Sequence, residues 1–242
     1  MHRFALILLA GLGLAAAHGA LAQGKPPAPS APPAQSTPPA QGKAPAQSGP
    51  APMTIAFEPR GVYATINMGP TRALTRRLSA PYGSDRRSAI REVRANAASV
   101  QPSVLYTLAN VLAEDYGDEA IFWYHVGRLR AVYDSLRCRD ESARTGAMLE
   151  LRKLLNVELR GAMYYRRERL VPIAQKAIEW DAKNPRSYDQ RWAALYGKVA
   201  ATSAGANPNE VTLPESEWPA ILKRVHETHL KSVEEFAKVK PN

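Results

Sequence analysis

One segment near the middle of the chain limits what the protein can fold into. Residues 118–137 are expected to form a helix that begins with Asp118 and Glu119, which suit the positive end of a helix dipole. The run 120–124 that follows leaves almost no polar face. A helix that is apolar on all sides is usually central, with neighbours around it, and Gly127 would let one neighbour approach closely. The chain must therefore supply other helices to surround this one.

Apolar residues at helical spacing, together with proline and glycine breaks, predict most of the remaining chain as helix. The expected helices cover residues 71–78, 84–98, 102–115, 141–162, 171–181, 188–201 and 217–238. Ser84 is expected to cap the second of them. The last helix has one clean apolar face and one charged face, which is typical of a surface helix that packs by one side.

The segment before the first helix is less regular. Residues 54–57 and 62–66 have some strand character, but Pro59 and Gly61 interrupt it. We expect residues 53–70 to form a short irregular N-terminal arm along the helical body. The predicted fold class is therefore all-α, as stacked helical hairpins or an irregular helical bundle.

The first residues have the features of a bacterial-type export signal. Arg3 supplies a positive charge, residues 4–17 are uncharged and mostly apolar, and Ala20-Leu21-Ala22 forms a small-x-small cleavage site. The apolar run is shorter than the roughly 20 residues of a membrane span. We expect residues 1–22 to be a signal peptide, cleaved after Ala22. The mature protein would then be periplasmic or secreted, without a transmembrane segment. An uncleaved anchor is the alternative.

A proline-rich linker is expected to follow at residues 23–52. Proline is its commonest residue, and it has no aromatic or acidic side chain. Such a segment cannot bury enough apolar surface to offset its ordering entropy, so we expect it to be disordered and extended. It would act as a passive tail, as a spacer or as a ligand for a wall component. The helical domain would then occupy residues 53–242.

Cys138 is the only cysteine, so the chain cannot close an internal disulfide. We expect Cys138 to be a small buried apolar residue. The alternative is an exposed thiol that forms an intermolecular disulfide, with a pKa lowered by Arg137 and Arg139.

Two stretches resemble fragments of tetratricopeptide or Sel1-like helical repeats. Residues 118–124 are similar to the second-helix Ala-x-x-Trp-Tyr pattern of Sel1-like units. Residues 176–185, leading to Tyr188, are similar to the junction between successive tetratricopeptide units. The separation of Ala120 from Ala177 is not a multiple of the roughly 34-residue tetratricopeptide period. The resemblance implies helical hairpins and a protein-binding scaffold.

His226 and His229 suggest a zinc site, because histidines three apart on a helix can share a metal. The zinc-protease motif needs a spacing of four, and any zinc site here needs a third ligand. His125 is the only other histidine after the predicted cleavage site. Because His229 lies within the apolar stripe of the last helix and His226 at its edge, we expect packed, hydrogen-bonded histidines. No cofactor or metal is expected.

Four acids, Glu114, Asp115, Asp118 and Glu119, cluster at a helix-to-helix turn beside aromatic residues. Paired carboxylates of this kind can hydrolyse sugars, although helix capping explains the same residues. A cell-wall-directed or metal-dependent hydrolase is therefore the alternative function. No nucleophile elbow and no phosphate-binding glycine loop follow the signal, so we expect no enzymatic activity.

The formal net charge of the chain is +10, and arginine is concentrated in two regions. Arginine and tyrosine together are typical of protein interfaces, and arginine also pairs with phosphate. The candidate interface consists of Arg86, Arg87, Arg91, Arg94, Arg160, Tyr164, Tyr165, Arg166, Arg167 and Arg169. An ordinary solvated face would have the same composition.

The expected function follows from the export signal and this basic surface. Outside the cytoplasm the anionic partners are acidic proteins and envelope components rather than nucleic acid. We expect an exported protein-binding module whose partner has an acidic surface. It would be an envelope scaffold or an immunity-type inhibitor of a periplasmic toxin. Anionic envelope polymers are the alternative ligand.

Overall fold

The structure is a computed structural model that describes residues 53–202 and 211–239. The predicted signal peptide (1–22) and the whole of the predicted linker (23–52) thus lie outside the described residues. The α-helices are α1 (Gly69–Ser79), α2 (Ser84–Ala95), α3 (Pro102–Leu112), α4 (Gly117–Leu136), α5 (Glu141–Lys153), α6 (Val157–Tyr165), α7 (Leu170–Lys183), α8 (Lys198–Thr202) and α9 (Trp218–Lys238). The 3-10 helices are η1 (Gly61–Thr65), η2 (Ala97–Ser99), η3 (Arg167–Arg169), η4 (Gln190–Tyr196) and η6 (Glu215–Glu217). These ranges contain no β-strand, so the all-α prediction is confirmed.

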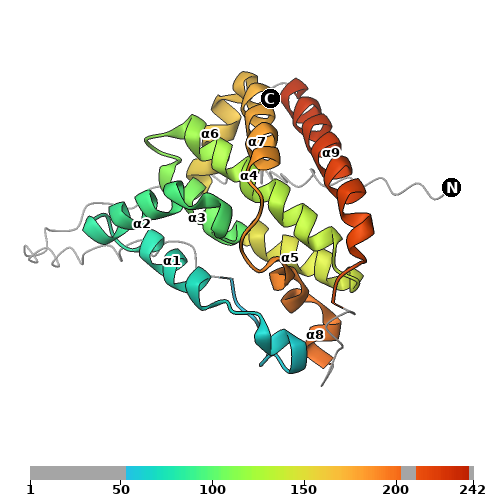
Figure 1. Cartoon of the computed structure of the whole chain (residues 1–242). Helices are drawn as coiled ribbons and strands as arrows, with labels where there is room; N and C mark the ends of the chain where they lie inside the picture. The colour runs from blue at the N-terminus through green and yellow to red at the C-terminus, as the bar shows by residue number, and fades with distance from the viewer. Residues whose placement is uncertain (1–52, 203–210, 240–242) are drawn as a thin grey trace, which may run out of the picture. The chain divides into compact units, whose positions relative to one another are not determined.

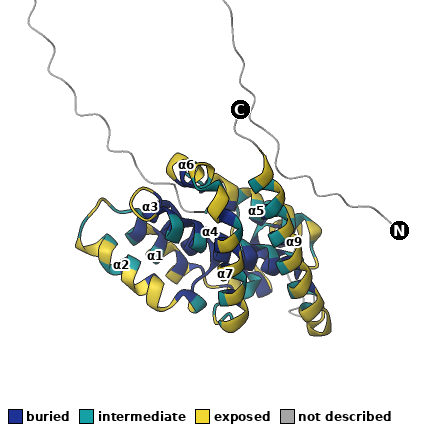
Figure 2. Cartoon of the chain, turned by 90° about the horizontal axis from the view of Figure 1, so that it is seen from above, coloured by how far each residue is buried: buried dark blue, intermediate teal, exposed yellow. Residues whose placement is uncertain are grey.

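Helix α4 is the central element, as its apolar sequence predicts. It packs against α3, α5, α6, α7, α9 and η4. Ala120, Ile121, Val126 and Leu129 are fully buried although they point in different directions around the helix. The helices α1 and α2 lie on one side of the α3–α4 pair, and α9 lies on the other (Figures 1 and 2).

The closest approach to α4 occurs at Gly127, where α3 crosses it. A Cβ atom at Gly127 would lie 2.9 Å from Tyr106 Cδ2 and 3.2 Å from Leu105 Cβ. Both α3 residues are buried and cannot move aside without disturbing the core. Glycine is therefore needed at this position because of the helix–helix distance.

The N-terminal arm lies along the helical body, as expected, but it forms no strand. Met53, Ile55 and Phe57 are half-buried against the core cluster that contains Trp192, and the residues between them are exposed. The segment 62–66 lies largely within η1 instead of extending as a strand.

The prediction of one helix over residues 141–162 is wrong, because the chain breaks between α5 and α6 at Asn156. The Asn156 side chain caps α6 by accepting a hydrogen bond from the Leu159 amide at 2.9 Å. Asn110 of α3 holds the break in place, since its side-chain nitrogen donates to the Leu154 carbonyl at 2.6 Å. No proline or glycine marks the site, so the sequence reads as a continuous helix.

The prediction of one helix over residues 188–201 is also wrong. The segment is divided into η4 and α8 by Gly197. A Cβ atom at Gly197 would lie 2.9 Å from the Ala143 Cβ and even closer to the Asp140 carboxylate. That carboxylate accepts a hydrogen bond from the Val199 amide at 2.9 Å, which fixes the start of α5 against this break.

The remaining predicted helices lie within a few residues of their observed bounds. Ser84 is the first residue of α2 and not its cap, because Gly83 occupies the cap position and no side chain caps the helix. The predicted helix over residues 84–98 ends at Ala95 and continues as η2. Helix α9 packs by one face, as predicted, through the residues Ile221, Val225, His229 and Val233.

We predict that Gly127→Ala lowers the free energy of unfolding by about 1–3 kcal/mol, because the added methyl group overlaps Tyr106. The matched control is Gly161→Ala in α6, where the nearest atom to the new Cβ is 3.9 Å away. This control should be neutral or raise the free energy of unfolding by up to about 1 kcal/mol through better helix propensity. Urea unfolding followed by circular dichroism measures both, and equal effects of the two substitutions would contradict the packing argument.

Candidate protein-binding surface

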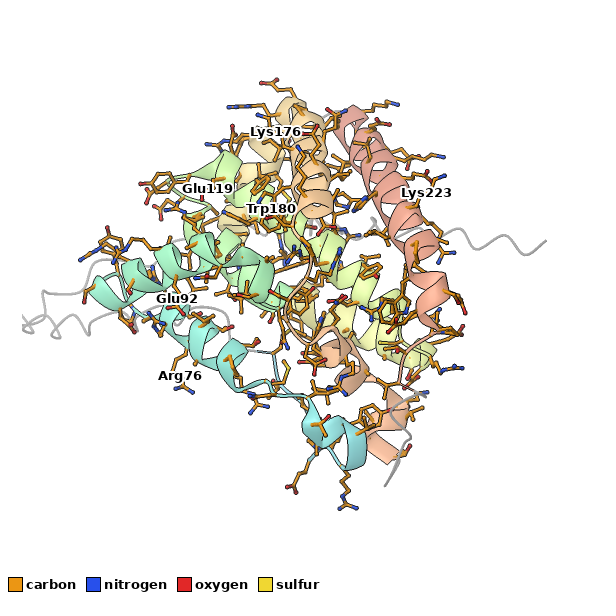
Figure 3. The ribbon with its side chains drawn as sticks, viewed as in Figure 1. Arg76, Glu92, Glu119, Lys176, Trp180 and Lys223 are labelled. Atoms are coloured by element: carbon orange, nitrogen blue, oxygen red, sulfur yellow. The ribbon has the colours of Figure 1, made fainter. Side chains whose placement is uncertain are left out.

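Helix α2 separates its charges onto two opposite edges. On the edge that faces α1, Asp85 and Glu92 pair with Arg77 of α1 at 3.0 Å and 2.6 Å. Figure 3 shows Glu92 on this side of α2. Ala89 and Val93 are fully buried and fix the helix to the core. Both acids of α2 are thus ion-paired within the protein, although they share the single charge of Arg77.

The opposite edge of α2 carries Arg87, Arg91 and Arg94, which we call the basic edge. Their i, i+4, i+7 spacing places them on one face of the helix, and all three are exposed. The Arg87 guanidinium lies 5.4 Å from the ring of Tyr82, and that of Arg94 lies 5.8 Å from the ring of Tyr116. Both tyrosines are prominently exposed, at 75% and 57%. Arg87 and Arg91 have no carboxylate partner in residues 53–202 and 211–239.

The C-terminal end of the basic edge meets the first turn of α4. Arg94 donates two hydrogen bonds to the Glu119 carboxylate, at 2.7 Å and 2.6 Å. The Trp123 indole donates a third to the same carboxylate at 3.0 Å. A carboxylate in this position is also stabilised by the helix dipole. Glu119 therefore joins α2 to α4.

The second arginine region lies beside the same turn of α4. Asp118 pairs with Arg169 and, at 3.4 Å, with Arg166. The Arg166 guanidinium lies directly over Gly117, where a Cβ atom would be 2.5 Å from its central carbon. The structure thus brings the two predicted arginine regions to one end of α4, but acids lie between them.

The other residues of the predicted interface are placed differently. Arg167 contacts the rings of Tyr164 at 4.8 Å and Phe236 at 5.6 Å, and it donates a hydrogen bond to the Val239 carbonyl. Its role is therefore to hold the end of α9. Tyr165 is 82% exposed. Arg160 bonds the Leu155 carbonyl at 2.9 Å.

Arg86 is half-buried beside the basic edge. The arginines of the second region are engaged in internal contacts. Arg87 and Arg91 are therefore the exposed arginines of the predicted interface whose side chains have no ion pair or hydrogen bond within the described residues.

The four acids proposed as hydrolytic candidates do not form a single constellation. Asp118 and Glu119 are ion-paired to arginines, as described, whereas Glu114 and Asp115 are exposed in the turn before α4. The contacts of Asp118 and Glu119 attach α6 and α2 to α4.

The two histidines of α9 face different neighbours. His226 Nε2 lies 3.0 Å from the Asp181 carboxylate of α7, and His229 Nε2 lies 3.0 Å from His125 Nδ1 of α4. Burial, assisted by the charge of Arg128, lowers the pKa of His125 to about 3. Burial and the neighbouring His125 hold the pKa of His229 well below its usual value. Within the described ranges, no three His, Cys, Asp or Glu side chains gather as a set of metal ligands.

Sequence reasoning missed a buried ion pair between Arg130 of α4 and Asp181 of α7. Both side chains are fully buried, and Arg130 Nε lies 3.0 Å from Asp181 Oδ1. The other donors of Arg130 reach the carbonyls of Ala97 and Ala98 at 3.2 Å and of Asn184 at 2.7 Å. The available signal was an arginine in the interior of a helix that the sequence already predicted to be central and surrounded by neighbours.

Asp181 is the centre of this network. It also accepts hydrogen bonds from Arg186 at 2.7 Å and pairs with His226. Burial alone would raise the pKa of Asp181, but the hydrogen bond to His226 and the charges of Arg186 and Arg130 outweigh it and lower the pKa.

Asp134, one turn beyond Arg130, is a second buried acid. Its Oδ2 accepts hydrogen bonds from Trp192 at 2.7 Å and Tyr188 at 2.8 Å, which fixes η4 to α4. Burial raises the pKa of Asp134 to about 6, against the opposing charge of Arg186.

Cys138 is fully buried, which confirms the structural interpretation of this residue. Burial and the nearby Asp134 raise the pKa of its thiol to about 12, in the opposite direction to the effect expected for an exposed thiol between arginines.

Comparison with known protein families, curated proteins and solved structures finds no match. The resemblance of residues 118–124 and 176–185 to helical repeats stays a prediction. In the described part of the chain, no helix has the length and hydrophobicity required to cross a membrane.

We predict that the His125–His229 pair makes the fold sensitive to acid. Both rings stay neutral when folded but titrate near 6.5 when unfolded, so the unfolded state binds more protons below that pH. Their contribution to the free energy of unfolding is complete above pH 6.5 and falls as the pH decreases toward about 3. His229→Gln should reduce the slope of the free energy of unfolding against pH by up to about 1.4 kcal/mol per pH unit between pH 6 and 4.

Urea unfolding at a series of pH values measures this slope. His226→Gln is the control for the loss of a histidine from α9, because His226 hydrogen-bonds the Asp181 carboxylate and not a second histidine. Since that hydrogen bond helps to lower the pKa of Asp181 below its ordinary value of 3.8, its loss should alter the profile mainly at the acid end of the series. The raised pKa of Asp134 makes the free energy of unfolding change with pH in the opposite direction near pH 4–6. Asp134 is present in the wild type and in both variants, so its contribution cancels when their pH profiles are compared. Parallel pH profiles for the wild type and His229→Gln would refute the prediction.

We also predict that Cys138 does not react with a maleimide while the protein is folded and reacts fully in denaturant, since its thiol is buried with a raised pKa. Intact-mass spectrometry detects the adduct. Rapid labelling of the native protein, or a disulfide-linked dimer on a non-reducing gel, would contradict this expectation.

Proposed function

We propose that this chain is an exported, non-enzymatic helical module that binds another protein through the basic edge of α2. The observation that carries the proposal is the pair Arg87 and Arg91, which are exposed, have no carboxylate partner in the described residues and lie between two exposed tyrosines. Arginine and tyrosine are the residues most often responsible for binding energy at protein interfaces. The partner would present an acidic surface.

The placement of the other arginines supports this assignment. Arg94, Arg166 and Arg169 are ion-paired within the protein, and Arg167 holds α9. Arg72 and Arg76 on α1 are also exposed, but neither stacks on an aromatic ring within the described residues. Figure 3 shows Arg76 pointing away from α2. Among the described residues, the basic edge therefore combines arginines that have no ion pair with exposed tyrosine rings in contact with its guanidinium groups.

The rigidity of α2 favours binding. Its inner side is fixed by Ala89 and Val93 in the core and by Arg77 at the edge. A surface that is already ordered loses less conformational entropy when a partner binds. The module would act as an envelope scaffold or as an inhibitor of a toxin in the periplasm, and the identity of the partner distinguishes these roles.

Affinity purification of the tagged full-length protein from an envelope extract tests the proposal. We expect a protein to co-purify in a fixed ratio at about 0.15 M salt, where long-range electrostatic attraction is screened. Arg87→Glu/Arg91→Glu should reduce the yield of this protein by at least about tenfold, because both charges are reversed at the contact.

Arg72→Glu/Arg76→Glu on α1 is the matched control, since it makes the same change in net charge on exposed arginines at the same spacing. It should retain the partner. Equal losses in the two variants would show that binding depends on net charge alone. Recovery of only wall polymer or lipid would establish the alternative ligand.

A further inference from the structure

The basic edge of α2 already binds one carboxylate from another helix of the protein. Glu119, in the first turn of α4, receives two hydrogen bonds from Arg94 and one from Trp123. The arrangement shows how a carboxylate on a crossing helix meets this edge. The paired oxygens match the two nitrogens of the guanidinium fork, which gives the contact geometric specificity.

Arg91 and Arg87 present two more guanidinium groups further along the same edge. With a rise of about 1.5 Å per residue, Arg91 lies about 4.5 Å from Arg94 along the axis, and Arg87 lies about 6 Å beyond Arg91. Acidic residues placed once per turn on another helix have the same spacing. These two arginines are exposed and have no ion pair in the chain as described.

We propose that the basic edge binds an acidic helix of the partner protein, in which Asp or Glu recurs once per turn and pairs with Arg91 and Arg87. Tyr82, which stacks with Arg87 and is 75% exposed, would cover the apolar side of that helix at its end. This inference rests on the proposed function and adds the chemical class of the partner.

The surroundings of the edge favour a short acidic helix over an extended polyanion. Glu114 and Asp115 are exposed in the turn that also carries Tyr116, which contacts Arg94. A polymer of phosphates or a lipid surface that continued past Arg94 would meet these two carboxylates and be repelled. A short helix that pairs only with Arg87 and Arg91 need not reach them.

The test measures binding of two peptides to the purified full-length protein by fluorescence anisotropy. Both are locked as helices by a side-chain lactam and have the same composition. In one, two glutamates stand at i and i+4, the spacing of Arg87 and Arg91, and in the other they stand on opposite sides of the helix. We expect the first to bind at least about tenfold more tightly, because only it places its carboxylates along one edge.

Substitutions in the protein locate the contact. Arg87→Glu/Arg91→Glu should weaken the matched peptide by at least about tenfold, while Arg72→Glu/Arg76→Glu should change its affinity by less than about threefold. A peptide with lysine in place of each glutamate should bind Arg87→Glu/Arg91→Glu more tightly than it binds the wild type. Arg87→Gln and Arg91→Gln repeat the test if the double reversal impairs folding, which circular dichroism reports.

Equal binding of the two peptides, no binding of either, or no effect of the α2 substitutions would overturn the inference. Tighter binding to phosphatidylglycerol vesicles than to the matched peptide, lost in Arg87→Glu/Arg91→Glu, would identify a phosphate surface as the ligand and overturn it too. A separate experiment decides the proposed function. It would stand if both peptides failed to bind but affinity purification yielded a protein in a fixed ratio whose recovery depended on Arg87 and Arg91.

Discussion

The burial of Arg130 in the central helix is the constraint on which the surrounding structure depends. A guanidinium group with no solvent exposure requires acceptors for its donors and a negative charge nearby. Asp181 supplies the charge, and the carbonyls of Ala97, Ala98 and Asn184 complete the set. These acceptors belong to η2, α7 and the turn after α7. Because one side chain bonds all of them, α4 fixes where α2 ends and how α7 lies.

The same network extends from Asp181 to α9. His226 contacts Asp181 Oδ2, and His229 contacts His125 of α4. Residues Ile221, Val225 and Val233 supply the apolar part of this interface. An apolar stripe by itself permits a helix to slide by one turn, whereas a hydrogen bond made at one position does not. The two histidines of α9 therefore determine its register, and the cost is that the rings of His229 and His125 must remain neutral.

The sequence predicts the features that depend on local pattern and misses those that depend on distant partners. The central position of α4 follows from its apolar run, the single packed face of α9 from its stripe, and the close approach at Gly127 from the absence of a side chain. The break at Asn156 depends on Asn110, which is far away in sequence. The break at Gly197 likewise depends on the start of α5. Local periodicity contains no information about either contact.

The residues of the candidate surface also divide into those that local sequence pattern predicts and those that depend on distant partners. The i, i+4, i+7 arginines of α2 can be read from the sequence. Their contacts with Tyr82 and Tyr116, and the carboxylates that pair with Arg94, Arg166 and Arg169, could be assigned only after folding. Arg130 holds η2 immediately after α2, and Glu119 holds Arg94 in its last turn, so the C-terminal end of α2 is fixed twice. The N-terminal end, near Arg87, is held by Arg77 alone among these polar contacts. Binding at Arg91 should consequently cost less conformational entropy than binding at Arg87, which makes Arg91 the stronger contact for a partner.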